Sequence, residues 1–284
     1  MYSFINNSRK IVIRISAAML LCYFLSACTS LIFRPQSDHE SVPIEIDTIK
    51  QDIYFRSQDG TKLHGWHLPS TQDPLNPKKT ILYLHGTTKN ISRHLGFVSW
   101  LPEKGYEVFL FDYRGYGKSE GKAHMDGVLA DIDAAIRFVA NKKANQQKII
   151  IMGHSLGASM GIYALNQSEK KNQIESFIVI SAFSDYQKVT RDFLNDYWFS
   201  WLFQWPLSLT MTNEYRPLDY VSSLSPIETY FLHGENDEII RPYHSVALFE
   251  AALQPKSISV LKTNHNDIFL YGENRKLVLD FLKK

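Results

Sequence analysis

Short apolar runs alternate with amphipathic stretches along most of this chain. The runs that read as strands occupy residues 51–57, 63–68, 80–84, 106–111, 148–152, 177–180, 228–232 and 257–261. Apolar residues at helical spacing predict helices over residues 126–141, 155–166, 242–252 and 274–283. Strands that alternate with helices indicate a largely parallel sheet with helices on both faces. The Asp59-Gly60 pair between the first two runs predicts an opening β-hairpin.

The composition is that of an ordinary globular protein. The chain has 284 residues, of which 44% are hydrophobic and 21% are charged, and its formal net charge is +2. This length suits one large α/β domain, which we predict to span residues 49–284. Lysine and arginine residues are scattered, so no basic surface points to a nucleic-acid partner.

The amino terminus differs from the rest of the chain. Basic residues between Arg9 and Arg14 precede an apolar stretch that ends in Leu25-Ser26-Ala27-Cys28. This layout is typical of a secretory signal peptide, and the stretch is shorter than the roughly 20 residues that span a bilayer. Its last four residues resemble the bacterial lipobox, in which the cysteine becomes the lipidated first residue. We predict a signal peptide over 1–28, lipidation at Cys28 and a tether over 29–48. An ordinary cleaved signal and an uncleaved anchor are the alternatives.

Cysteine usage agrees with this prediction. Cys22 lies inside the predicted signal and Cys28 at its end, which leaves no thiol in the rest of the chain for a disulfide. Thr29 follows the cysteine, and resemblance to bacterial lipoproteins implies that a residue other than Asp there favours the outer membrane. We therefore expect a lipid-anchored protein of the cell envelope, facing the periplasm in a Gram-negative organism.

The pentapeptide Gly153-His154-Ser155-Leu156-Gly157 directly follows one of the predicted strands. A serine at the tip of a sharp strand-to-helix turn needs small neighbours two residues away on either side, because the backbone is strained and the helix folds back closely. Small and apolar residues follow at helical spacing. The pattern predicts a nucleophilic serine; a glycine-flanked turn with a solvated serine is the alternative.

Further polar blocks also stand just past predicted strands. They are His85-Gly86-Thr87, Asp112-Tyr113-Arg114-Gly115-Tyr116-Gly117-Lys118-Ser119, His233-Gly234-Glu235-Asn236-Asp237 and Asn264-His265-Asn266-Asp267. With the serine turn, these blocks resemble the α/β-hydrolase superfamily, in its depalmitoylase-like and monoacylglycerol lipase-like branch. The resemblance covers roughly residues 45–284. It implies the α/β-hydrolase fold, with an eight-stranded, mostly parallel sheet and a small helical cap between the sixth and seventh strands.

The resemblance also implies a role for particular residues. Ligands of open parallel sheets bind at the carboxyl ends of the strands, where Ser155, Asp237 and His265 fall in the chain order of α/β hydrolases. Ser155 is expected to attack a carbonyl, His265 to act as general base and Asp237 to orient the imidazole. The backbone N–H groups of Thr87 and Leu156 are the expected oxyanion hole.

Other carboxylates near these positions leave the choice of orienting residue open. Glu235, Glu238 and Asp267 all lie close in sequence to the predicted site. Asp267 also suits a helix N-cap or a hydrogen bond to its own loop.

The remaining polar residues of the blocks have structural interpretations. His85, His154 and His233 stand beside glycine turns, and no spacing suggests a metal or cofactor site, so we predict neither. Asp112 and Arg114 are interpreted as a local pair that holds their loop.

The segment from Phe183 to Pro217 occupies the position of the cap. It is dense in aromatic residues, namely Tyr186, Phe193, Tyr197, Trp198, Phe199, Trp201, Phe203 and Trp205. These residues can form a wall over an acyl pocket, a surface that dips into lipid, or the core of a small helical cap.

These observations together predict a membrane-tethered serine hydrolase. It would cleave carboxylic esters or thioesters through an acyl-enzyme intermediate, with no cofactor and a small acyl substrate as its partner. A serine aminopeptidase-like peptidase would use the same triad, and acidic residues in the cap would favour it. A catalytically inactive envelope binding module is the alternative from another class.

Overall fold

The computed structural model describes residues 32–142, 148–196, 198 and 200–283. The predicted signal peptide, Cys28 and the aromatic residues Tyr197 and Phe199 lie outside the described residues. Within the described ranges, no helix is both long and apolar enough to span a membrane.

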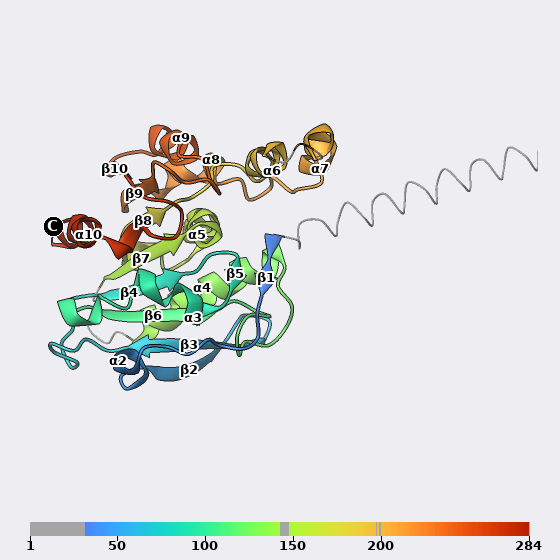
Figure 1. Cartoon of the computed structure of the whole chain (residues 1–284). Coiled ribbons are helices and arrows are strands. Elements are labelled where there is room, and N and C mark those ends of the chain that lie inside the picture. Colours follow the sequence, from blue (N-terminus) through green and yellow to red (C-terminus); the bar gives the residue numbers. More distant parts are fainter. Residues whose placement is uncertain (1–31, 143–147, 197, 199, 284) are drawn as a thin grey trace, which may run out of the picture.

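An eight-stranded sheet forms the centre of the molecule (Figure 1). Its strands are β2 (Gln51–Arg56), β3 (Lys62–Leu68), β4 (Thr80–Leu84), β6 (Glu107–Asp112), β7 (Ile149–His154), β8 (Ile174–Ile180), β9 (Glu228–Gly234) and β10 (Lys256–Leu261). They lie in the order β10-β9-β8-β7-β4-β6-β3-β2, and only β3 runs antiparallel to its neighbours. The predicted fold and its mostly parallel sheet are confirmed.

Helices cover both faces of the sheet because side chains alternate along each strand. In β4, Leu82 and Leu84 join the core under α4 (Met125–Lys142), α5 (Leu156–Gln167) and α9 (Tyr243–Ala251). Ile81 and Tyr83 join the core under α3 (Ile91–His94) and α10 (Gly272–Leu282). Burial of both faces explains why β4 and β7 read as continuous apolar runs. Short 3₁₀ turns occupy Leu95–Phe97, Pro102–Lys104, Lys171–Gln173, Trp201–Phe203, Val221–Leu224 and Ile268–Leu270.

The segment before the sheet packs against the domain. Phe33 is buried, β1 (Arg34–Pro35) pairs in parallel with β5 (Thr88–Lys89), and α2 (Ile44–Asp47) buries Ile46. We call residues 32–48 the N-terminal strap. The packed domain therefore begins at residue 32, inside the segment predicted as a tether, because isolated apolar anchors without periodicity leave no local pattern in the sequence.

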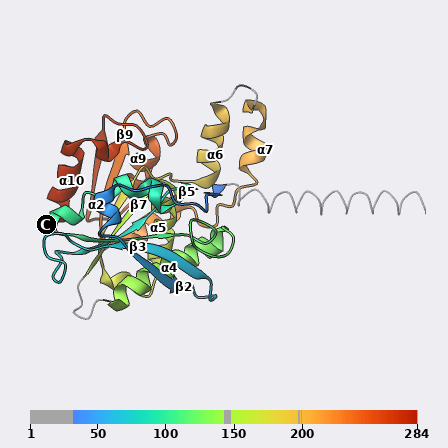
Figure 2. The ribbon, with the colours of Figure 1, turned by 60° about the horizontal axis from the view of Figure 1, so that its bottom comes forward.

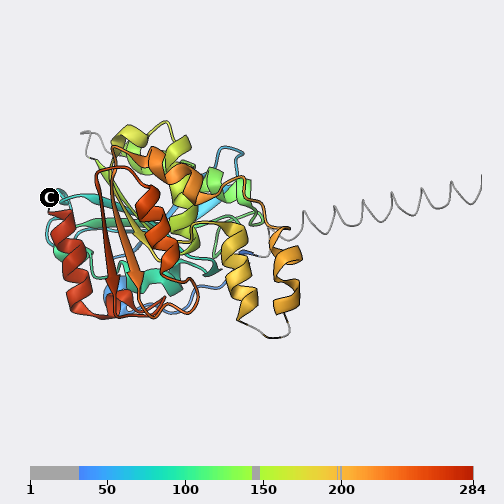
Figure 3. The ribbon, with the colours of Figure 1, turned by 90° about the horizontal axis from the view of Figure 1, so that it is seen from above.

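The cap lies between β8 and β9, the predicted sixth and seventh strands. It contains α6 (Tyr186–Asn195), α7 (Gln204–Ser208) and α8 (Pro217–Tyr220). Helices α6 and α7 pack against each other as a hairpin that stands beside the main body of the protein (Figures 2 and 3). Asp185 caps α6, since its side chain accepts a hydrogen bond from Lys188 N at 2.7 Å.

Candidate active site

Ser155 stands at the tip of the turn between β7 and α5. Its φ of 55° and ψ of −120° are strained for a residue with a side chain. The helix after it folds back so closely that a Cβ on Gly157 would lie 2.4 Å from Leu84 O and from His85 O, and one on Gly153 would lie 2.7 Å from Ala158 Cα. The glycines of the pentapeptide are therefore required by the close approach of the chain.

His265 and Asp237 form a close pair. His265 Nδ1 donates a hydrogen bond to Asp237 Oδ2 at 2.6 Å, although the residues are 28 positions apart. Asp237 also accepts hydrogen bonds from Ile239 N at 2.9 Å and Ile240 N at 2.8 Å. The structure thus selects Asp237 over the neighbouring carboxylates: Glu235 and Glu238 are exposed, and both oxygens of Asp267 bond Asn264, at 2.7 and 3.1 Å.

The surroundings of Asp237 keep its carboxyl ionised. Burial raises the pKa of Asp237, but hydrogen bonds from His233 and His265 and from the backbone outweigh burial, and the net pKa lies well below its usual value. His233 is itself fixed, with Nε2 2.8 Å from Ile240 O and Nδ1 2.6 Å from Ser245 Oγ. An ionised carboxylate on Nδ1 leaves Nε2 of His265 as the nitrogen able to accept a proton.

Ser155 and His265 line one pocket of about 510 Å³. Among the described residues, no hydrogen bond joins the Ser155 hydroxyl to His265. Catalytic hydrogen bonds are often long before substrate binds, so this arrangement is compatible with a nucleophile and its base. The three residues predicted from separate blocks of the sequence meet at the carboxyl edge of the sheet.

The predicted oxyanion residues lie beside the serine. A Cβ built on Gly86 would lie 3.5 Å from Ser155 Cβ, which places the loop after β4 directly against the nucleophile. Thr87 and Leu156 both line the pocket. As the first residue of α5, Leu156 has no acceptor for its N–H within the helix. The two residues expected to supply the oxyanion hole therefore lie in the same pocket as Ser155.

The N-terminal strap holds the loop that carries Thr87. Arg34 N donates to Thr87 O at 3.0 Å, and the Tyr116 hydroxyl donates to the same carbonyl oxygen at 2.7 Å. The Thr87 hydroxyl bonds Ile32 O. Sequence reasoning missed the roles of the strap and of Tyr116, because they depend on contacts between distant parts of the chain.

Buried histidines bond the backbone of the loops that carry the site residues. His154 Nε2 donates to His265 O at 3.1 Å, and burial above all lowers the pKa of His154 well below its usual value, so it is neutral. His85 Nδ1 donates to Gly86 O at 2.7 Å, and burial lowers the pKa of His85 to about 3. Both have the structural contacts predicted for them. His94, which the sequence did not single out, bonds Thr88 O at 3.0 Å and lines the pocket.

Asp112 and Arg114 do not form the local pair that we predicted. Arg114 Nη2 bonds Asp131 at 2.7 Å and Arg114 Nη1 bonds Asp59 at 2.7 Å. Asp112 is the last residue of β6, whereas Arg114 lies in the turn that follows, so the two side chains are directed independently and Asp112 has other partners. Its partners are the histidines described next.

His39, His64 and Asp112 form the one group of potential metal ligands found among the described residues. Asp112 Oδ2 lies 2.7 Å from His39 Nε2 and 3.2 Å from His64 Nδ1. His64 Nε2 in turn lies 2.6 Å from Asp52 Oδ1. Both nitrogens of His64 thus lie within hydrogen-bonding distance of a carboxylate oxygen. This group joins the strap to the sheet.

The cap forms the far wall of the pocket. Its pocket-lining side chains are mostly apolar and come mainly from α6 and the segment after α7, namely Tyr186, Val189, Thr190, Phe193, Leu194, Leu207, Thr210 and Met211. Ile32 and Arg34 of the strap line the same pocket. No carboxylate belongs to the described lining. The site therefore suits an apolar group next to a reactive carbonyl.

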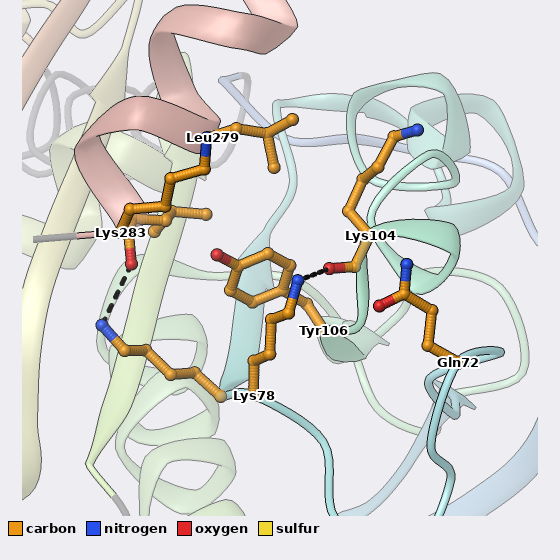
Figure 4. A pocket seen from close by; sticks show the side chains of 8 residues that line it. Gln72, Lys78, Lys104, Tyr106, Leu279 and Lys283 are labelled. Atoms are coloured by element: carbon orange, nitrogen blue, oxygen red, sulfur yellow. Dashed lines mark hydrogen bonds between the residues drawn. The ribbon is translucent and has the colours of Figure 1, made fainter.

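A second pocket, of about 610 Å³, lies at the opposite edge of the sheet (Figure 4). Lysines dominate its lining, and they bond protein oxygens: Lys78 Nζ donates to Lys104 O at 2.8 Å and Lys79 Nζ to Leu282 O at 3.1 Å. Its described lining contains no serine, histidine or carboxylate. This pocket lacks the groups needed for acyl transfer.

The sheet, the serine turn and the histidine–carboxylate pair define an α/β hydrolase. The chain belongs to the family described as serine aminopeptidase, S33, which matches residues 75–223. The uncharacterized protein YfhR of Escherichia coli (strain K12) is 31% identical over 244 residues, 82% of this chain and 80% of YfhR.

Solved structures share the fold at lower sequence identity. The Pyrococcus furiosus esterase Pf2001 is similar with a TM-score of 0.72 and 20% identity, over 88% of this chain and 96% of that chain. The Pyrococcus horikoshii acylaminoacyl peptidase is similar with a TM-score of 0.63 and 19% identity, over 83% of this chain and 41% of that chain. The common fold therefore accommodates both an esterase and a peptidase.

Proposed function

We propose that this α/β hydrolase is a serine hydrolase that cleaves carboxylic esters or thioesters through an acyl-enzyme. The observation that supports this most directly is the pair of His265 Nδ1 and Asp237 Oδ2 at 2.6 Å, in a pocket that Ser155 also lines. Ser155, His265 and Asp237 can then act as the nucleophile, the general base and the orienting carboxylate of acyl transfer.

In the proposed reaction, Ser155 Oγ adds to the substrate carbonyl while His265 Nε2 takes the hydroxyl proton. Backbone N–H groups of Thr87 and Leu156 receive the negative oxygen of the tetrahedral intermediate. The intermediate collapses as His265 returns the proton to the leaving alcohol or thiol, which leaves an acyl group on Ser155. Water then repeats the sequence and releases the acid.

The lining of the pocket favours an ester or thioester over a peptide with a free amino terminus. A carboxylate is the strongest side-chain partner for an α-ammonium group, and the described lining contains none. Three acidic residues of the cap have other partners: Asp185 bonds Arg216 at 2.7 Å, Asp196 bonds Arg241 at 2.5 Å, and Asp192 bonds His244 at 3.1 Å. The fourth, Glu214, is exposed and does not line the pocket. The peptidase alternative thus lacks a carboxylate for the ammonium in the described lining.

The second part of the proposal is the anchor. We propose that a lipid on Cys28 tethers the protein to a membrane of the cell envelope, with the outer membrane favoured. The lipobox-like sequence Leu25-Ser26-Ala27-Cys28 supports this. If Cys28→Ala left membrane attachment and processing unchanged, the anchor would be wrong.

Labelling by a fluorophosphonate tests the catalytic part. The purified protein should be labelled covalently, and Ser155→Ala should abolish both the label and ester turnover, by about 10⁶-fold in kcat. An absence of labelling in well-folded protein would instead favour the inactive binding module.

A further inference from the structure

The outer side of the cap exposes a cluster of large apolar side chains. We call this cluster the cap surface; its members are Trp198, Trp201, Leu202, Phe203, Trp205, Leu207 and Leu209. Trp198 is 88% exposed and Leu202 71% exposed. So many exposed large apolar side chains in one short segment are unusual on a soluble monomer, and such segments mark a surface that contacts a partner or a membrane.

The chemistry of the cap surface is that of a lipid interface. No charged residue occurs in the sequence between Asp196 and Glu214, so a partner held by salt bridges has nothing to bind there. Tryptophan is enriched where an apolar layer meets water, because its ring is large and its N–H is polar. Arg191 lies 4.8 Å from the ring of Trp205, at the border of the patch, where a long basic side chain can reach lipid head groups.

The cap surface and the wall of the pocket belong to the same helical hairpin. Val189, Phe193 and Leu194 of α6 line the pocket, and Leu207 of α7 belongs to both the lining and the cap surface. The cap surface and the apolar wall of the pocket therefore meet at Leu207.

The strap brings the predicted anchor to the same place. Ile32 lines the pocket, and in all three ribbon views the first described residues lie beside the α6–α7 hairpin (Figures 1, 2 and 3). Cys28 precedes Ile32 by four residues, which span at most about 14 Å of extended chain. A lipid on Cys28 would therefore hold Ile32, which lines the pocket, no farther from the bilayer than this extended length.

We infer that the cap surface inserts into the bilayer that holds the anchor, and that the substrate is an acyl ester or thioester resident in that bilayer. This inference rests on the proposed function and specifies its substrate class. A second copy of this chain could also cover an apolar patch, but the short reach of the anchor favours the membrane, since it places lipid at the cap of each single molecule.

Tryptophan fluorescence tests the insertion directly. The chain has five tryptophans, of which Trp66 and Trp100 are buried in the core and the others belong to the cap surface. The lipidated full-length protein in phosphatidylcholine vesicles should lose fluorescence when the lipid acyl chains carry bromine, a contact quencher. An anchored protein whose fluorescence is the same in brominated and ordinary vesicles would overturn the inference.

A variant pair tests the substrate class. In Trp201→Asp/Leu202→Asp, turnover of an acyl lipid embedded in vesicles should fall roughly tenfold or more, because two large apolar groups no longer bind the bilayer. Turnover of water-soluble p-nitrophenyl acetate should be unchanged, which also shows that the variant folds. The matched control is Leu75→Asp, since Leu75 is 90% exposed and precedes β4 at the opposite edge of the sheet.

The outcomes separate the inference from the proposed function. If the wild type hydrolyses neither substrate, the proposed function fails. If it hydrolyses both and the double variant retains vesicle turnover, only the inference fails. Self-association of the wild type through the cap, lost in the double variant and without quenching by brominated lipid, would assign the cap surface to a second copy and overturn the inference.

Discussion

Two buried carboxylates in this protein have similar surroundings and different consequences. Asp237 bonds His265 and His233, and Asp112 bonds His39 and His64; each also accepts backbone N–H groups. Burial raises the pKa of both carboxyls, and hydrogen bonds lower it further than burial raises it. The carboxylate itself therefore does not distinguish an active site from a structural joint.

The histidines make the difference. His265 gives one nitrogen to Asp237 and its ring lines a pocket beside Ser155. His64 gives both nitrogens to carboxylates, Asp112 and Asp52, and lies away from that pocket. An imidazole can exchange a proton with a substrate only through a nitrogen that no neighbour occupies. The matched substitutions below should separate the two assemblies.

The largest expected effect is on catalysis at Asp237. In Asp237→Asn, the amide no longer stabilises the imidazolium and favours the wrong tautomer of His265, so kcat should fall by about 10⁴-fold. Steady-state kinetics with a soluble ester measure this, with a thermal melt to show that the variant is folded. A decrease smaller than tenfold would point to another orienting group.

The same substitution at Asp112 should act on stability. Asp112→Asn removes the charge that faces His39 and His64, and breaking a buried pair in this way costs about 3–5 kcal/mol. Urea titration measures the free energy of unfolding. The kcat of the folded fraction should change by less than about tenfold, because Asp112 does not line the pocket; a loss as large as that of Asp237→Asn would erase the contrast.

The interactions of Asp112 with His39 and His64 should also make the free energy of unfolding depend on pH in the acid range. Burial raises the pKa of Asp112, but hydrogen bonds from His39 and His64 lower it to about 2. A carboxyl with a lowered folded pKa stabilises the protein above its ordinary pKa of about 3.9, and this contribution disappears as the pH falls through about 2. Roughly 2 kcal/mol of unfolding free energy should be lost in that window. Urea titrations at stepped pH should give a shallower decline in Asp112→Asn than in the wild type.

The smallest effect on catalysis is expected where the strap contacts the loop that carries Thr87. Tyr116→Phe removes the hydroxyl that donates to Thr87 O and accepts from Arg34 N. Loss of these hydrogen bonds should cost about 1 kcal/mol of stability. The N–H of Thr87 is displaced and not removed, so kcat should fall by less than about tenfold while KM stays the same. A change in KM alone would indicate that the strap acts on substrate binding.

The elements and the chemistry of the predicted site were largely legible in the sequence. Predicted and observed strands agree to within about three residues, as for 80–84 and β4, because apolar runs and helical spacing are local properties. The serine turn could be predicted because the glycines of the pentapeptide mark it. Gly157 is needed there since a side chain would clash with the backbone of Leu84. The resemblance to α/β hydrolases implied the pairing of His265 with Asp237, and the structure selected Asp237 from the neighbouring carboxylates.

The sequence could not show what holds these parts in place. His39 lies 73 positions from Asp112, and neither residue carries a local pattern that names the other. Arg114 likewise forms ion pairs with Asp131 and Asp59, and not the predicted pair with Asp112. Such contacts form only when the folded sheet brings distant segments together, and many pairings of the same residues are equally compatible with the sequence.

The chain's order of apolar and polar residues thus determined the elements and the fold, and the resemblance to α/β hydrolases added the candidate nucleophile and base. Only the tertiary structure decided that residues 32–48 pack as a strap, which side of the cap faces the pocket and which side faces outward. The physical reason is that periodicity acts over a few residues, whereas burial of Phe33 and exposure of Leu202 depend on surfaces built from the whole chain.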